Sequence, residues 1–121
     1  MNIEQFREYC ISKEAVTESF PFNETTLVFK VYGKMFALCD IELFEYANLK
    51  CDADKALELR EMFSAVKPGY HMSKKHWNSV YFHEDLPEKD ILKLVDHSYE
   101  LIIQSISKRK KEKWEEENSS T

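Results

Sequence analysis

The sequence predicts an α+β fold in which helices pack on one face of an antiparallel sheet. Two observations lead to this class. Segments with helical spacing of apolar residues alternate with segments of strand character, in the order helix, strands, helix, strands, helix, and one strand pair is joined by a short turn at Gly33. With 121 residues, 43% of them hydrophobic, the chain is long enough for one domain with a real core.

The first half of the chain supplies one helix and most of the predicted strands. Residues 2–13 place apolar side chains at helical spacing, so a short amphipathic helix is expected there. Pro21 cannot donate to a strand ladder, which predicts an edge strand or a strand end at SFPF (19–22). Residues 25–40, TTLVFKVYGKMFALCD, alternate apolar side chains around Gly33 and predict a hairpin. A further extended segment is expected over residues 44–50.

The second half supplies two helices and a second strand pair. A helix is expected over residues 53–63, capped by an aspartate that precedes or begins it. Pro68-Gly69 ends this region, and residues 70–74 and 77–83 are predicted to form the arms of the second pair, with Trp77 in the core. The longest helix is expected from residue 85 to about residue 107. Its core stripe comprises Ile91, Leu92, Val95, Tyr99, Ile102 and Ile106.

The end of the chain differs in composition from the rest. We expect residues 1–107 to form the single domain. Residues 108–121, KRKKEKWEEENSST, are expected to be a charged C-terminal extension, for which a helix and a frayed tail are the alternatives.

Composition also sets expectations about the compartment. Cys10, Cys39 and Cys51 are odd in number, far apart and without a CxxC pair, which suits a reducing cytoplasm better than a disulfide framework. No apolar run approaches the roughly 20 residues of a membrane span. The first residues also lack the apolar region of a secretory signal. A cytoplasmic protein that does not associate with membranes is therefore expected. The sequence leaves the oligomeric state open, with a monomer favoured.

The distribution of charge suggests a surface for a polyanion. The chain has 22 acidic and 17 basic residues, yet residues 25–39 and 64–83 contain no acid. Both windows are predicted hairpins, whose lysines can reach phosphates, and histidines add positive charge below about pH 6.5. The candidate nucleic-acid contacts are Lys30, Lys34, Lys67, His71, Lys74, Lys75, His76 and Asn78. The alternative is that the lysines keep strand edges soluble and that Asn78 bonds a turn backbone.

Six blocks of the sequence resemble a known family. They are SFPF (19–22), VFKVYGKMFAL (28–38), NLKC (48–51), LR (59–60), AVKPGYHMSKKHWNSV (65–80) and HSYEL (97–101), and their order resembles that of the MmcQ/YjbR family. The resemblance implies a CyaY-like fold, similar to bacterial frataxin. It also implies a small bacterial DNA-binding protein with a double-wing arrangement. The tail after residue 108 lies outside the resemblance.

These observations favour a non-enzymatic DNA-binding protein that contacts phosphates through lysines of two hairpin regions. Its affinity should be modest and sensitive to salt, because the rest of the chain is acidic. No catalytic motif, cofactor motif or zinc spacing is present, so no enzyme, cofactor or metal is expected. The alternatives are an adaptor that binds a protein or a small anion, and frataxin-like metal binding through Glu4, Glu8, Glu14 and Glu18.

Overall fold

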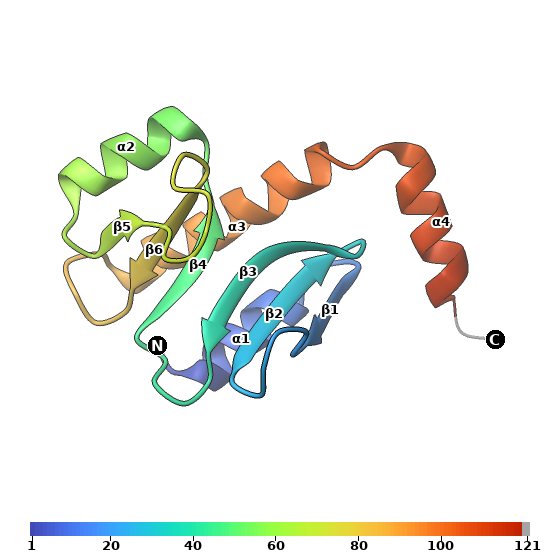
Figure 1. The fold of residues 1–121 in the computed structure, drawn as a ribbon, viewed down its shortest axis with the longest axis horizontal. Coiled ribbons are helices and arrows are strands. Elements are labelled where there is room, and N and C mark those ends of the chain that lie inside the picture. The colour runs from blue at the N-terminus through green and yellow to red at the C-terminus, as the bar shows by residue number, and fades with distance from the viewer. Residues whose placement is uncertain (120–121) are drawn as a thin grey trace.

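The computed structural model describes residues 1–119, and this part of the chain forms four helices and a six-stranded sheet (Figure 1). The strand order is β1-β2-β3-β4-β6-β5, and all neighbouring strands are antiparallel. The predicted α+β class is thus confirmed. The elements are α1 (Ile3–Ile11), β1 (Val16–Ser19), β2 (Thr26–Val31), β3 (Lys34–Asp40), β4 (Tyr46–Lys50), α2 (Ala53–Met62), β5 (Val66–Pro68), β6 (Trp77–Tyr81), α3 (Glu88–Gln104) and α4 (Lys108–Asn118).

The main core lies between the sheet and its helices. Figure 1 shows α1 and α3 behind the strands, and α2 lies at the edge formed by β5. Phe6 of α1, Phe29 and Phe36 of the hairpin and Val95 of α3 are completely buried in one cluster. The rings of Phe6 and Phe29 meet edge-on, with centroids 6.0 Å apart. Each such side chain contributes about 1.5–3 kcal/mol by leaving water, so this layer holds the fold together.

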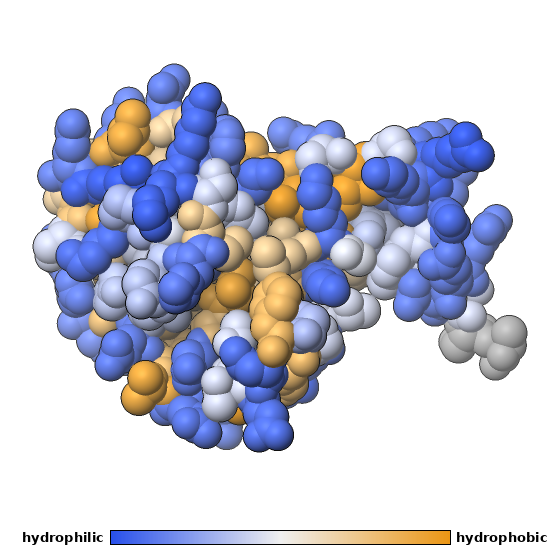
Figure 2. All heavy atoms as spheres, viewed as in Figure 1, coloured by the Kyte–Doolittle hydropathy of each residue, from blue (hydrophilic) through white to orange (hydrophobic). Residues whose placement is uncertain are grey.

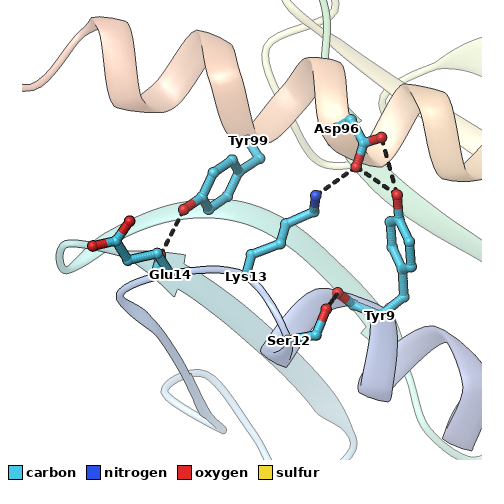
Figure 3. A network of polar contacts seen from close by, with 6 residues as sticks. All are labelled: Tyr9, Ser12, Lys13, Glu14, Asp96 and Tyr99. Carbon is cyan, nitrogen blue, oxygen red and sulfur yellow. Dashed lines mark hydrogen bonds and ion pairs between the residues drawn. The ribbon is translucent and has the colours of Figure 1, made fainter.

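A polar network fixes α1 against α3 (Figure 3). The Tyr9 hydroxyl donates to the Asp96 carboxylate at 2.7 Å, and the Lys13 ammonium pairs with the same carboxylate at 2.5 Å. Lys13 also lies over the rings of Tyr9 and Tyr99, at 4.9 and 5.1 Å from their centroids. The Tyr99 hydroxyl donates to the carbonyl of Glu14 at 2.6 Å. Burial, with the bond to Asp96, raises the pKa of Tyr9 to about 12, so Tyr9 is a neutral donor at ordinary pH.

A second link joins α3 to the middle of the sheet. Ser98, which is completely buried, accepts a hydrogen bond from the Lys50 amide at 2.9 Å and donates one to the Phe36 carbonyl at 2.6 Å. The ladder between β3 and β4 reaches only from Cys39 to Ala37 on β3. The serine therefore satisfies two backbone groups just beyond the end of this ladder, where buried polar groups need partners.

The predicted hairpin at Gly33 is confirmed as β2 and β3. Tyr32 and Gly33 form the two-residue turn with φ of 48° and 79°, and positive values at both positions are typical of a type I′ turn. A bulge between Phe29 and Lys30 shifts the register before the turn. As a result Lys30 pairs with Met35 and Val31 pairs with Lys34.

The first arm of the second strand pair lies earlier in the chain than predicted, whereas the second arm, β6, lies where it was expected. We expected the first arm at residues 70–74, whereas β5 ends at Pro68 and pairs with β6. The expectation was wrong because β5 is an edge strand, where a proline without an amide hydrogen is tolerated.

Residues 69–76 instead form a loop between β5 and β6. The Gly69 amide donates to the Trp77 carbonyl at 2.8 Å, and a Cβ at Gly69 would lie 2.8 Å from the Cβ of Trp77. Only glycine permits this approach. His71 has φ of 60°, outside the extended region, so the chain turns here.

A smaller apolar cluster lies on the opposite face of the sheet, which we call the open face. It consists of Val28, Leu38 and Trp77, with Met35 and Met72 packed against them. The prediction that Trp77 is buried is confirmed, but its partners belong to this second cluster rather than to the main core.

After residue 107 the chain is helical and projects from the body as α4 (Figure 1). Its ring contact is between Trp114 and Tyr32, with centroids 5.4 Å apart, and Trp114 also lies beside Gly33. Lysines and an arginine occupy its beginning and glutamates its end, which opposes the helix dipole. Residues 120 and 121 of the predicted extension lie outside the described part of the chain.

Candidate functional site

The open face is poor in carboxylates. Strand alternation and register identify the side chains that point away from α1 and α3. Lysine occurs three times among them, as Lys30, Lys50 and Lys67, whereas Asp40 is the one carboxylate at a strand position of this face. Asp40 Oδ1 accepts the backbone amides of Glu42 and Leu43 at 2.8 and 3.0 Å. The strands of an acidic protein thus present a face on which positive charge exceeds negative charge.

A groove of about 430 Å³ lies on the open face. Met35, Leu38 and Asn48 contribute strand side chains to its lining, and the segments at residues 22–23 and 70–72 line it from two loops. Figure 2 shows this face, with orange and pale spheres gathered near its centre among blue ones. The volume is in the range of small-ligand sites.

Three hydrogen bonds in a closed ring hold one side of the groove. The Tyr70 amide donates to Ser79 Oγ at 2.9 Å, Ser79 Oγ donates to Asn48 Oδ1 at 2.5 Å, and Asn48 Nδ2 donates back to the Tyr70 carbonyl at 3.1 Å. Asn48 is 5% exposed and Ser79 1%. Because the serine hydroxyl donates to it, Oδ1 of Asn48 has a defined orientation, and the backbone of Tyr70 is fixed over the sheet.

Aromatic side chains line the groove on both sides. Tyr70 is 56% exposed and Phe22 66%, although both are large and apolar. Tyr46 meets Tyr81 with centroids 4.9 Å apart and Tyr70 edge-on at 6.4 Å, and the His71 ring lies 4.1 Å from that of Tyr70. Burial raises the pKa of Tyr46, with smaller contributions from neighbouring tyrosines and acids, so its hydroxyl remains protonated. Exposed rings gathered around one concave site are typical of a binding groove.

Two of the predicted lysines lie on the open face, at its two sides. Lys30 belongs to β2 and Lys67 to β5, four strands apart, or roughly 19 Å at the usual strand spacing. The Lys67 ammonium lies 5.9 Å from the ring centroid of Tyr81.

Lys34 is not on the open face. Its register partner, Val31, points into the main core, and its ammonium donates to Ser105 Oγ at the end of α3, at 2.8 Å. The hairpin tip therefore does not contribute this lysine to the face that carries Lys30.

The remaining predicted cations lie on the loop between β5 and β6. Lys74 donates to the Gly69 carbonyl at 3.0 Å, so its ammonium is held against the loop. The side chains of Lys75, His71 and His76 are exposed. The same loop lines the groove through residues 70–72, which brings these cations near the open face.

Asn78 is a correction to the predicted set. It is 2% exposed and points to the side of the helices, where its Oδ1 accepts a hydrogen bond from Arg60 Nε at 2.7 Å. Arg60 also donates to the carbonyls of Lys74 and Trp77. A base or phosphate cannot reach the Asn78 side chain without opening this contact between α2 and β6, so its role is structural.

Sequence reasoning missed Lys50, Asn48 and Tyr46. All three alternate on β4 and point to the open face, opposite Trp77, Ser79 and Tyr81 of β6, respectively. The alternation in YANLK (46–50) was a usable signal, since it places the three polar or aromatic side chains on one face and Ala47 and Leu49 on the other. It was overlooked because Lys50 lies outside the two acid-free windows.

The described residues offer little for nucleophilic or metal chemistry. All three cysteines are buried. Burial raises the pKa of each thiol, to about 12 for Cys39 and about 11 for Cys51, so thiolates are scarce at neutral pH. Within residues 1–119 no three His, Cys, Asp or Glu side chains come together as a metal site. In the same range, no helix combines the length and apolar character that crossing a membrane requires.

Comparison with known proteins identifies the family. The model of the YjbR family matches residues 11–101, which include the groove and every lysine of the open face. The chain belongs to the YjbR family. YbdF of Escherichia coli O157:H7 is 38% identical over 91 residues, which cover 74% of this chain and 75% of YbdF. YjbR of Escherichia coli K12 is 30% identical over 112 residues, which cover 92% of this chain and 95% of that protein.

Solved structures extend the YjbR comparison to the fold. The crystal structure of the Deinococcus radiodurans protein DR2400, of the domain family DUF419, matches with a TM-score of 0.85 and 32% identity. The match covers 93% of this YjbR-family chain and 87% of DR2400. A Pseudomonas syringae protein matches with a TM-score of 0.70 and 27% identity, over 84% of this chain and 98% of its own.

Proposed function

We propose that this YjbR-family protein is a non-enzymatic DNA-binding protein that uses the open face of its sheet. One observation carries the proposal. The open face combines three lysines and exposed aromatic rings with a single strand carboxylate, in a chain whose net charge is −5. Lysines bind phosphates without regard to sequence, and exposed rings supply surfaces for bases.

The position of the acids supports this surface. At ordinary salt, charges separated by more than about 8–10 Å are largely screened, so the local composition of a face matters more than the net charge. Glu18, for example, is on the edge strand β1 but points to the helix face, where it pairs with Arg7 at 2.7 Å. A polyanion at the open face therefore meets the lysines at short range, and the acidic remainder limits the affinity to a modest value.

The proposed contact differs from two projecting wings. The tip of the first hairpin is occupied by Trp114 of α4, and Lys34 is bonded to Ser105. The first hairpin would contribute Lys30 from its strand. The second region would contribute Lys67 from its edge strand and Lys75 from its loop, and β4 between them would add Lys50.

The test is a binding titration with fluorescent oligonucleotides at several salt concentrations. We expect saturable binding whose affinity falls steeply with salt and which heparin competes away. Binding that does not change with salt, or no binding at 50 mM salt, would overturn the proposal. An adaptor that holds an acidic peptide or small anion in a shaped pocket would be distinguished by its indifference to heparin.

A further inference from the structure

The shape and the side chains of the groove on the open face limit which part of a nucleic acid could bind there. It is concave, it lies between the strands that carry Lys30 and Lys67, and its rings are exposed. We infer that the groove takes one unpaired base that bears an amino group, and that the protein therefore prefers single strands containing such bases over thymine- or uracil-only strands. This inference deepens the proposed function and rests on it.

The shape of the groove favours an unpaired base. Its lining comes partly from loops, at residues 22–23 and 70–72, which flank the strand residues. In a duplex the bases are stacked and only their edges are accessible, so they cannot enter a recess between two loops. An unpaired base can turn into the groove and stack on an exposed ring, which is the usual way in which proteins bind single strands. Tyr70 is suited to this because the ring of hydrogen bonds with Ser79 and Asn48 fixes its backbone.

The polar groups of the groove favour a base with an amino group. Asp40 is the one carboxylate among the described side chains that line the groove, and a carboxylate can only accept hydrogen bonds. Its Oδ1 is engaged by two backbone amides, whereas Oδ2 takes part in no hydrogen bond with the described residues. The amino groups of cytosine, adenine and guanine donate to such an oxygen. The carbonyl at the same position of thymine or uracil repels it.

The phosphates of the bound single-stranded DNA could contact the lysines on either side of the groove. Lys67, Ser79, Asn48, Leu38 and Val28 follow one another across the sheet in register, so Asn48 and Leu38 of the groove lie between the strand of Lys67 and β2. Lys30 lies two residues beyond Val28 on β2. The Asp40 carboxylate would then select the base, while Lys30 and Lys67, which lie farther from the groove, would bind the phosphates of the DNA.

The experiment compares oligo-dC with oligo-dU of equal length at pH 7.5. Cytosine and uracil differ by the amino group against a carbonyl, with the same phosphates, and oligo-dT adds a control for the methyl group. We expect the full chain to bind oligo-dC about tenfold more tightly than oligo-dU, and a duplex more weakly than oligo-dC. Equal affinity for oligo-dC and oligo-dU would overturn the inference.

The decisive variant is Asp40→Asn. Asparagine retains the Oδ1 that accepts the amides of Glu42 and Leu43, so the local turn is preserved, and its added amino group can donate to a carbonyl. We expect the dC:dU affinity ratio to fall to within about twofold, although the loss of a negative charge strengthens binding of both oligonucleotides. A ratio that stays at the wild-type value would exclude Asp40 as the selecting group and overturn the inference.

A second variant tests stacking independently of base selection. Tyr70→Ala should weaken oligo-dC and oligo-dU alike, by about fivefold or more, without changing the salt slope. Unchanged affinity for both would remove the stacking step. The two proposals can fail separately: salt-dependent binding that is equal for duplex and single strands removes only the groove inference, whereas the absence of binding to any nucleic acid removes the proposed function as well.

Discussion

The open-face lysines should control the salt dependence of DNA binding. We consider the double substitution Lys30→Gln/Lys67→Gln, which removes two positive charges at opposite sides of the open face. Both side chains lie on strand positions that point away from the main core, and glutamine keeps most of their length. The fold should therefore be retained, and the change should act on binding.

The magnitude follows from the number of phosphates that the face can contact. Lys30, Lys50, Lys67 and Lys75 would neutralise about four, which for a single strand gives a slope of log affinity against log salt of about −2.8. Raising salt from 50 to 200 mM would then cost about 50-fold in affinity. Two contacts fewer would reduce the slope to about −1.4 and the cost to about sevenfold.

Fluorescence anisotropy of a labelled 15-mer oligo-dC between 50 and 200 mM salt measures both slopes. The matched control is Lys89→Gln/Lys93→Gln, which removes the same charge from exposed positions of α3, on the other side of the sheet. The control should keep the wild-type slope, because its lysines lie on the other side of the sheet and their interaction with the bound DNA is largely screened by salt. If the open-face pair and the control changed the slope equally, the effect would be one of net charge, and the proposed surface would be refuted.

Three further predictions concern the scaffold. Gly69→Ala should lower the free energy of unfolding by about 1–3 kcal/mol, because the new Cβ would lie 2.8 Å from atoms of Trp77; an unchanged urea midpoint would contradict this. Ser98→Ala should cost about 2–4 kcal/mol in the same assay, since two buried backbone groups lose their partner; a loss under about 0.5 kcal/mol would be inconsistent with that role. The Tyr9 pKa of about 12 in the folded state predicts that stability is retained below pH 10 and falls as the pH rises from 10 to 12, because the unfolded chain releases the proton first. Tyr9→Phe should lack this component, and identical pH profiles by thermal unfolding would argue against it.

Much of the fold could be predicted because its signals are local. Helical spacing identified α1, α2 and α3, and the sequence around Gly33 identified the hairpin. The first arm of the second pair was misplaced because Pro68 and Gly69 are typical of a chain break. Whether a proline is tolerated depends on whether its strand is at an edge, which is decided by pairing with strands elsewhere in the chain.

The candidate site was harder to predict because it depends on which face each residue occupies. The acid-free windows drew attention to Lys30 and Lys67, which the structure places on the open face. The bulge between Phe29 and Lys30, however, determines that Lys34 points toward the helices, and a shift of one residue reverses the faces of a strand. Asn78 depends on Arg60, a residue of another element, and that contact has no signature in the sequence around Asn78.

The attachment of α4 has a consequence for how the chain responds to heat and proteases. A helix of 11 residues is marginal by itself, and this one has its charges ordered unfavourably and contacts the tip of the first hairpin through Trp114 and Lys111. It should therefore melt at temperatures at which the sheet is still intact, so that circular dichroism loses helical signal before the aromatic core signal changes. Cleavage by trypsin, which cuts after lysine and arginine, would then begin in residues 108–113 and leave a resistant fragment that retains the groove.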